Sequence, residues 1–249
     1  MIFASATNGM SVIRVISACF QTAIKAIYEL LICSLLPNFS SATPTDTELW
    51  ALIATRIHLD DSRLYSLYLE TQPRLGNDLE RVSTVQIRTA LNRRLGSSWE
   101  VSLGYAWTPF LYDAEYKAIF RSEHRSWQGV SFSQSWSGLD LQYRLRQEQR
   151  YIEGLGGIAN RSRIQVKINI PFDHDKTIGI ATFDEIMIHI GDTTGGPRAG
   201  YDRNRIFAGP FYVRGQTRYE VGYLGEHAKR FGNDERWVNA LFFSILTEW

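Results

Sequence analysis

The sequence has little cysteine, and this excludes several kinds of scaffold and site. Only Cys19 and Cys33 occur in 249 residues. A disulfide-rich scaffold needs more cysteines, and a cysteine-based zinc site needs them in closely spaced pairs. Both cysteines lie within the leader described below. Its removal would leave a chain without cysteine, which suits a protein that crosses an oxidising periplasm.

Long apolar runs and a strong net charge are also absent. No stretch after the leader reaches the roughly 20 apolar residues of a membrane-spanning helix, and the mean hydropathy is −0.21. A transmembrane β-barrel has this composition, because only alternate residues of each strand meet lipid. The net charge of +1 gives no sign of a nucleic-acid partner, and we expect none.

The motifs of common catalytic and metal sites are missing as well. No two of the five histidines have metal-ligand spacing, and there is no G-x-S-x-G serine elbow. Ser131, Ser133 and Ser135 alternate along one expected strand and read most simply as small lumenal residues. We therefore expect no metal, no cofactor and no catalytic residue. A lipid-modifying hydrolase built on serine and histidine is kept as an alternative.

The N-terminal part has the composition of a secretory signal peptide. Arg14 and Lys25 precede a short apolar run, which ends in a small-x-small cleavage site. We expect residues 1–42 to be a removed signal peptide and residues 43–249 to form one domain. The basic segment is long for a signal, so that a start at Met10 stays open, and an amphipathic helix kept in the mature protein is the alternative.

Beyond the leader, apolar and polar residues alternate with period two. In the clearest segment, 139–150, leucine and tyrosine occupy one face and charged side chains the other. A helical period would not separate the two classes over this length. The chain is therefore expected to be all-β. The alternating segments are 48–60, 62–75, 79–95, 98–112, 125–138, 139–153, 161–172, 176–191, 203–214, 217–230 and 236–249.

Short turns and longer links alternate between these segments, as in outer-membrane barrels. The pattern predicts an antiparallel up-and-down transmembrane β-barrel of 10–12 strands. Twelve is favoured, because bacterial single-chain barrels have even strand numbers. Alternation is interrupted at 183–185, where we expect a β-bulge.

Aromatic residues indicate which face meets lipid. Trp107 follows Trp99 by eight positions, about 27 Å of strand and about 20 Å of height at a tilt near 40°. This approaches the roughly 25 Å apolar band between the aromatic girdles of such barrels. A soluble barrel with its apolar face inward is the outside alternative. The expected girdle residues are Trp99, Trp107, Trp136, Trp237 and Trp249.

The C-terminal segment has the pattern of a closing barrel strand. Leu241, Phe243, Ile245 and the final Trp249 share one face of an extended chain. An outer-membrane barrel ends on such a strand, with the last aromatic at the lipid–water boundary. We expect the bacterial outer membrane as location. The expected partners are outer-membrane lipids and the outer-membrane barrel assembly machinery, which would be engaged through this strand.

Several stretches resemble a known group of proteins. Leu141–Arg150, Arg161–Phe172, Phe183–Ile188, Asn204–Gly209 and Glu220–Tyr223 occur in this order. They resemble the bacterial outer-membrane β-barrel proteins catalogued as domain of unknown function 2490, from about Trp50 to Trp249. The resemblance implies an exported outer-membrane barrel. It brings no agreed activity and no assigned residues.

The charged faces of the expected strands carry the clearest functional signal. If they line a lumen, they either attract small anions into a narrow pore or pair with residues such as Glu70 in a closed network. The second arrangement is the one we expect, in a protein of structural or transport-related function. The residues of this expected lumenal network are Arg88, Arg144, Arg146, Glu148, Arg150, Arg163, Lys167, Glu185, Arg218 and Glu220.

Overall fold

The computed structural model of the chain describes residues 45–111, 122–229 and 235–249. All of them belong to one compact unit, Thr43–Trp249. The expected signal peptide, with both cysteines, lies outside the described residues. Within the described ranges, no helix is long and apolar enough to cross a membrane.

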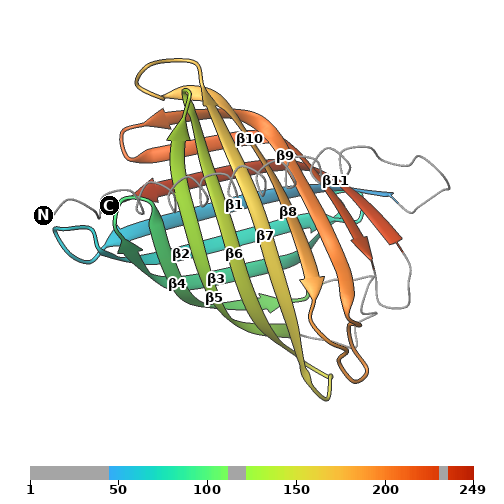
Figure 1. Cartoon of the computed structure of the whole chain (residues 1–249). Coiled ribbons are helices and arrows are strands. Elements are labelled where there is room, and N and C mark those ends of the chain that lie inside the picture. The colour runs from blue at the N-terminus through green and yellow to red at the C-terminus, as the bar shows by residue number, and fades with distance from the viewer. Residues whose placement is uncertain (1–44, 112–121, 230–234) are drawn as a thin grey trace, which may run out of the picture. The chain divides into compact units, whose positions relative to one another are not determined.

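The described residues form one closed sheet of eleven β-strands (Figure 1). Each strand pairs with its neighbours in the sequence, and β1 closes the ring against β11. The all-β barrel is therefore confirmed, and the strand count falls within the expected range. The strands are β1 (Thr45–His58), β2 (Tyr65–Gly76), β3 (Arg81–Leu95), β4 (Trp99–Pro109), β5 (Ser122–Trp136), β6 (Leu139–Ile152), β7 (Ile158–Pro171), β8 (Ile178–His189), β9 (Gly200–Arg214), β10 (Thr217–Lys229) and β11 (Glu235–Glu248).

The favoured count of twelve strands is corrected by the way the ring closes. Strands β1 and β11 are parallel, with Thr45 opposite Trp237 and Arg56 opposite Glu248. All other neighbouring pairs are antiparallel. An odd number of meandering strands leaves the first and last pointing the same way, so one parallel seam closes the barrel without a twelfth strand.

The bulge expected at 183–185 is also wrong. Phe183, Asp184 and Glu185 pair in continuous register with both β7 and β9. The register shift in β8 comes later, between Met187 and Ile188. Alternation looked broken because the outward Asp184 is polar, and it accepts a 2.5 Å hydrogen bond from the side-chain amide of Asn204.

The two rims of the barrel differ in their connections. Residues 96–98, 137–138 and 215–216 make tight turns at one rim, the short-turn rim, where β11 also ends. The link 190–199 lies at the opposite, long-loop rim, where β1 begins. Ser137 and Gly138 both have positive φ, 50° and 83°, as two-residue hairpins with the right twist require.

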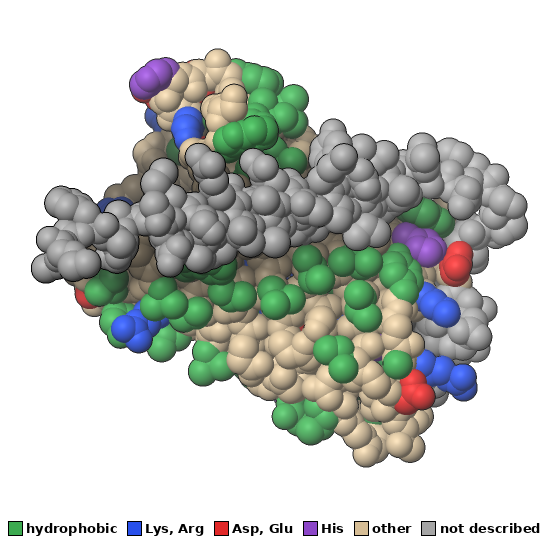
Figure 2. Space-filling model, in the orientation of Figure 1, with side chains coloured by type: hydrophobic (Ala, Val, Ile, Leu, Met, Phe, Trp, Pro, Cys, Tyr) green, Lys and Arg blue, Asp and Glu red, His purple; other side chains and the backbone are tan. Residues whose placement is uncertain are grey.

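Side chains divide between the two faces of the wall by type. Leu103, Leu145 and Ile164 point outward and are 61%, 49% and 47% exposed, whereas Glu148 and Glu185 inside are 1% and 2% exposed. On the face shown in Figure 2, hydrophobic side chains are spread over the wall and charged ones lie toward its ends. The distribution of side chains is therefore the reverse of that in a soluble protein. Charged side chains lie inside the barrel, and apolar side chains cover its outer surface.

Part of the interior is apolar, which the sequence pattern did not reveal. Phe207 stacks on Phe183 at 5.4 Å between ring centroids and meets Phe242 edge-on at 5.3 Å. Trp50 and Leu224 belong to the same buried cluster. These side chains fill the space beside β8 to β11 and β1, so the remaining interior is narrower than the ring of strands.

Candidate functional site

A chain of buried ion pairs crosses the middle of the barrel interior. Arg161 and Arg163 of β7 bind Glu148 of β6 at 2.6 and 2.9 Å. Arg163 also binds Glu185 of β8 at 2.7 Å. Glu148 lies directly opposite Arg161 in the register, so neighbouring strands present opposite charges to one another. Each buried carboxylate is shared by two arginines, which offsets its loss of hydration.

The chain continues toward the long-loop rim on one side. Arg150 of β6 binds Glu123 of β5 at 2.5 Å, and Arg125 reaches the same carboxylate at 2.5 Å. Arg161 extends to Asp202 of β9 at 2.7 Å. The bulge in β8 and β9 turns Asp202 inward next to Arg203, because two consecutive residues of the bulged strand then face the lumen.

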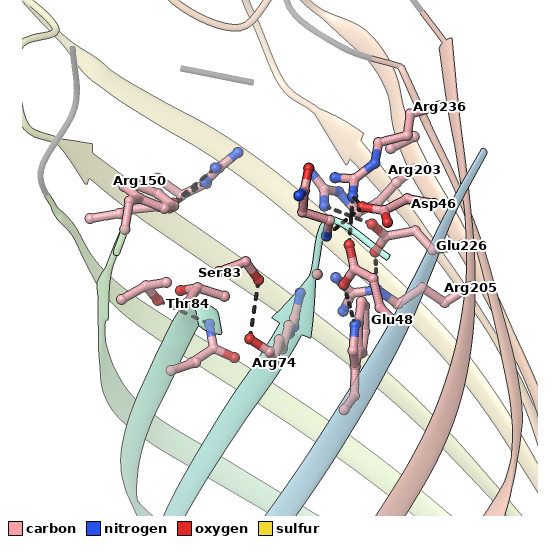
Figure 3. Close-up of a pocket in the computed structure, with 18 of the residues that line it drawn as sticks. Asp46, Glu48, Arg74, Ser83, Thr84, Arg150, Arg203, Arg205, Glu226 and Arg236 are labelled. Atoms are coloured by element: carbon pink, nitrogen blue, oxygen red, sulfur yellow. Dashed lines mark hydrogen bonds and ion pairs between the residues drawn. The ribbon is translucent and has the colours of Figure 1, made fainter. Parts of the chain in front are cut away.

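A second cluster gathers where β1, β9, β10 and β11 meet at the same rim (Figure 3). Glu226 forms ion pairs with Arg205 at 2.5 Å and with Arg203 at 3.3 Å. Glu48 accepts hydrogen bonds from the Trp50 indole and Arg236, both at 2.5 Å. Opposite charges from the first and last strands thus meet across the parallel seam.

A third group lies on the short-turn side of the interior. Arg88 binds Glu70 at 2.8 Å. Lys167 and Arg218 share Glu220, each at 2.6 Å. The ten residues expected to line a lumen all face the interior. Nine of them belong to this group or to the central chain and its extension, whereas Arg146 takes part in no ion pair among the described residues.

Sequence reasoning missed several members of these clusters. Glu123, Arg161, Asp202, Arg205 and Glu226 are as central as the residues that were expected. Arg161 and Glu226 share parity with the predicted lumenal residues Arg163 and Glu220 on their own strands, so alternation held a signal for them. No lumenal residue had been predicted on β9, the strand of Arg205. Glu123 preceded the expected start of its strand at residue 125, and Asp202 faces inward only because of the bulge.

Two cavities remain between the ion pairs. The first, toward the long-loop rim, has a volume of about 300 Å³ and the second, toward the short-turn rim, about 270 Å³. Trp50, Arg163 and Arg205 border both cavities and so form the partition between them. Among the described residues, eight arginines and five carboxylates line the first cavity, and seven cations and four carboxylates line the second. Both cavities therefore carry an excess of positive charge.

Two interior arginines have no carboxylate partner among the described residues. Arg146 lies 4.0 Å above the Trp127 ring, and its Nε and Nη1 make no hydrogen bond within the described chain. Arg74 lies 3.7 Å above the Trp50 ring and donates to the Gln72 side chain at 2.8 Å. Stacking on an aromatic face stabilises a guanidinium but leaves its in-plane donors available.

The expected girdle residues all lie near strand ends. Trp99, Trp136 and Trp249 are at the short-turn rim, and they are 49%, 67% and 66% exposed. Trp107 and Trp237 are toward the long-loop rim, and the Trp237 ring packs on His227 at 4.8 Å between centroids. Three of the five residues thus lie at one end of the apolar wall and two toward the other.

The described residues contain no group of three histidine, cysteine or acidic side chains that could hold a metal ion. The serine that ends the expected row, Ser135, donates to Asp140 at 2.6 Å rather than to a histidine. His174 is fully exposed in the turn after β7. These residues form no nucleophile–base pair.

Comparisons with known proteins identify a family for this chain. The model of the family described as "Protein of unknown function (DUF2490)" matches residues 47–237, from β1 into β11. An uncharacterized protein of Methylorubrum extorquens is 28% identical over 165 residues, which cover 65% of this chain and 71% of that protein. No solved structure matches the chain. Since the family model covers most of the sequence, the chain belongs to the DUF2490 family, a family of unknown function.

Proposed function

We propose that this protein is a β-barrel of the bacterial outer membrane. The inverted distribution of side chains carries the proposal, because an exposed apolar wall around buried charges suits lipid outside and a polar lumen inside. The exposed tryptophans near both ends of the wall support the proposal, since tryptophan favours the lipid–water boundary. The short turns would face the periplasm and the longer links the exterior.

The assembly route follows from the same proposal. Strand β11 carries outward Leu241, Phe243 and Ile245 and ends beside Trp249. A barrel must close within the membrane, because an open sheet edge cannot be satisfied by lipid. We assign β11 as the segment that the barrel assembly machinery engages, and outer-membrane lipids as the partner of the wall.

Cell fractionation and gel mobility test the location. The protein is expected in the outer-membrane fraction, and its unheated form should migrate differently in SDS from the boiled form, because a closed barrel resists SDS. Recovery in the soluble fraction with no mobility shift would overturn the proposal.

Within that location, the lumen fits a narrow route for small anions. The two cavities lie in series, and each has more cations than carboxylates. A low-dielectric wall focuses the field of this excess and raises the local concentration of anions. The partition of Trp50, Arg163 and Arg205 limits the route to small solutes and low conductance.

Planar bilayer recordings test the route. The wild-type protein is expected to give small, anion-selective currents, and the R144S/R146S variant should lose selectivity because it removes two cations from the second cavity. A barrel that shows the mobility shift but carries no current would refute the route while leaving the location intact.

A further inference from the structure

We propose that the second cavity is a binding site for a small oxyanion, a carboxylate or phosphate group, with Arg146 as its anchor. This deepens the proposed anion route by naming the site at which the solute is held. Arg146 is 5% exposed and borders the cavity, and its Nε and Nη1 atoms are buried without a hydrogen-bond partner among the described residues. A buried cation without a partner is costly, so an anion in the cavity would complete its hydrogen bonding.

The carboxylates that line the cavity form ion pairs with cations other than Arg146. Glu70 binds Arg88, Glu100 binds Arg56 at 2.5 Å, Glu185 binds Arg163, and Glu220 binds Lys167. None of these carboxylates bonds Arg146. Among the described residues of the cavity lining, Arg146 is therefore the one cation without a carboxylate partner.

The backbone register explains why Arg146 has no carboxylate partner on the adjacent strands. Its direct neighbours across the sheet are Gly129 on β5 and Arg163 on β7. Glycine offers no acceptor side chain, and Arg163 is a cation that binds Glu148 and Glu185. No acidic partner thus stands beside Arg146 on either adjacent strand.

The position of the Arg146 side chain is fixed by the packing of Trp127 beneath it. The Trp127 indole lies against Gly104 of β4, where a Cβ atom would come within 2.3 Å of the ring. The indole is 3% exposed and forms the floor under the guanidinium. A stacked guanidinium presents its donors in one plane, the geometry that binds two oxygens of a carboxylate or phosphate.

The rest of the cavity suits a small oxyanion. Ser131 and Gln142 offer uncharged hydrogen-bond donors. Arg144 adds a second cation, which contacts Glu185 through one of its terminal nitrogens at 2.9 Å. The volume of about 270 Å³ limits the ligand to a small solute.

Binding by the folded barrel in detergent tests the site without requiring conduction. Inorganic phosphate and acetate are the two probes, titrated at constant ionic strength and followed by calorimetry and by Trp fluorescence. We expect saturable binding by the wild type and at least a tenfold loss of affinity in R146Q. The preferred probe distinguishes a phosphate from a carboxylate ligand.

The matched control is R56Q/E100Q, which removes an ion pair from the same cavity and leaves the net charge unchanged. Its affinity should stay within twofold of the wild type. R146K keeps the charge but loses the planar fork, and it should bind with intermediate affinity. Equal affinity in wild type and R146Q, or no saturable binding of either probe, would overturn the proposal.

Stability supplies a readout that a purely structural role would not give. Without added anion, R146Q should unfold at a urea concentration equal to or above that of the wild type, because it removes an unpaired buried cation. The probe should raise the midpoint of the wild type but not that of R146Q. If R146Q unfolds earlier than the wild type, the anchor role is wrong. Binding without conductance would refute only the anion route.

A different observation carries a second inference, on the outer wall. Six uncharged polar side chains face outward on three adjacent strands near the long-loop rim. Apolar residues occupy the paired positions on either side, Leu103 and Tyr105 on β4 and Ile188 on β8. The cluster is therefore a polar island in the apolar wall. Its members are Ser126, Gln128, Gln147, Gln149, Asn160 and Ser162.

These side chains bond to one another but keep unused groups. Gln128 and Gln149 exchange two hydrogen bonds of 3.2 Å, and Ser162 donates to Gln147 at 2.5 Å. The amide nitrogen of Gln147 donates to no described residue. Lipid chains cannot satisfy such groups, and charged headgroups are not selected by an island without charge.

We infer that a second copy of this chain covers the island. Amide groups both donate and accept, so the patch is complementary to itself, as a two-fold symmetric interface requires. The inference rests on the outer-membrane location, which the mobility shift tests separately.

Disulfide crosslinking between copies tests this interface. In reconstituted vesicles, protein carrying Gln147→Cys should form a crosslinked dimer, whereas protein carrying Ile53→Cys should not, because Ile53 faces outward on β1, on the opposite part of the wall. The Q147L/Q149L variant should remain folded by mobility shift and should fail to retain a differently tagged copy. No crosslink at Gln147→Cys in folded protein, or equal retention by Q147L/Q149L, would overturn the inference.

Discussion

At the scale of single residues, Gly104 sets the position of Trp127 and, through it, of Arg146. A Cβ atom at this position would meet the indole at 2.3 Å and the Thr89 carbonyl oxygen at 2.6 Å. Gly104→Ala should therefore destabilise the barrel by about 1–3 kcal/mol, the usual cost of overpacking. Urea unfolding of the refolded barrel measures this. Gly156→Ala is the matched control, since nothing lies within 4 Å of its added methyl group.

Glu185 is the residue whose loss should cost most among the lumenal charges. It is 2% exposed and bound by Arg163 at 2.7 Å and Arg144 at 2.9 Å. Glu185→Gln removes the carboxylate partner of Arg144 and one of the two partners of the buried Arg163, so we expect a loss of about 3–5 kcal/mol in unfolding free energy. The control is Glu80→Gln, whose exposed pair with Arg81 at 3.9 Å should contribute less than about 1 kcal/mol. Equal effects of the two substitutions would contradict the prediction.

At the scale of elements, Asp173 organises the turn between β7 and β8. Its carboxylate accepts backbone hydrogen bonds from Thr177 and Ile178, both at 3.0 Å, and the Thr177 hydroxyl at 2.6 Å. These bonds lower the pKa of Asp173 to about 2 from an ordinary value of 3.8. A lowered pKa means that the stabilisation is complete above about pH 4 and is lost as pH falls through about 2.

The stability difference between wild type and Asp173→Asn should follow that pH dependence. The difference should be constant from neutral pH to about pH 4 and should shrink toward pH 2, because the wild-type carboxylate then becomes protonated. Unfolding midpoints across this range measure it. Asp175→Asn, in the same turn and exposed, is the control. A difference that grows on acidification would have the wrong sign.

The parallel seam between β1 and β11 is the element that distinguishes this barrel from an even-stranded one. Thr47 lies opposite Asn239, while Phe243 lies opposite Ala51. In a variant that lacks the two native cysteines, the pair Thr47→Cys/Asn239→Cys should form a disulfide in the folded barrel. The pair Thr47→Cys/Phe243→Cys should not, because its residues are about 13 Å apart along the seam. The reverse result would mean that the barrel closes in another register.

At the scale of the whole molecule, the height of the apolar wall should set the preferred membrane. Trp107 follows Trp99 by eight positions, which correspond to about 20 Å of height at a tilt near 40°. Refolding into vesicles should therefore be more complete in thin bilayers with short acyl chains than in thick ones, because mismatch has a cost. The fraction with heat-modifiable gel mobility measures this. Better refolding in the thicker bilayer would contradict the proposed membrane band.

The sequence by itself determined the class of fold and the two faces of the wall. Period-two alternation reports local geometry, since successive side chains of a strand point to opposite faces whatever the strand pairs with. The segment at 139–150 therefore revealed both its outward leucines and its inward charges, such as Glu148. The signal was weaker where register irregularities intervene, as at Asp202.

Only the tertiary structure decided the ring closure and the pairing of charges. The parallel seam joins strands at opposite ends of the chain, and no local pattern specifies that contact. Whether a lumenal arginine is paired depends on which residues the register places beside it, so Arg163 and Arg146 look alike in sequence. One binds two carboxylates and the other lies unpaired over Trp127, because Gly129 and another arginine are its neighbours.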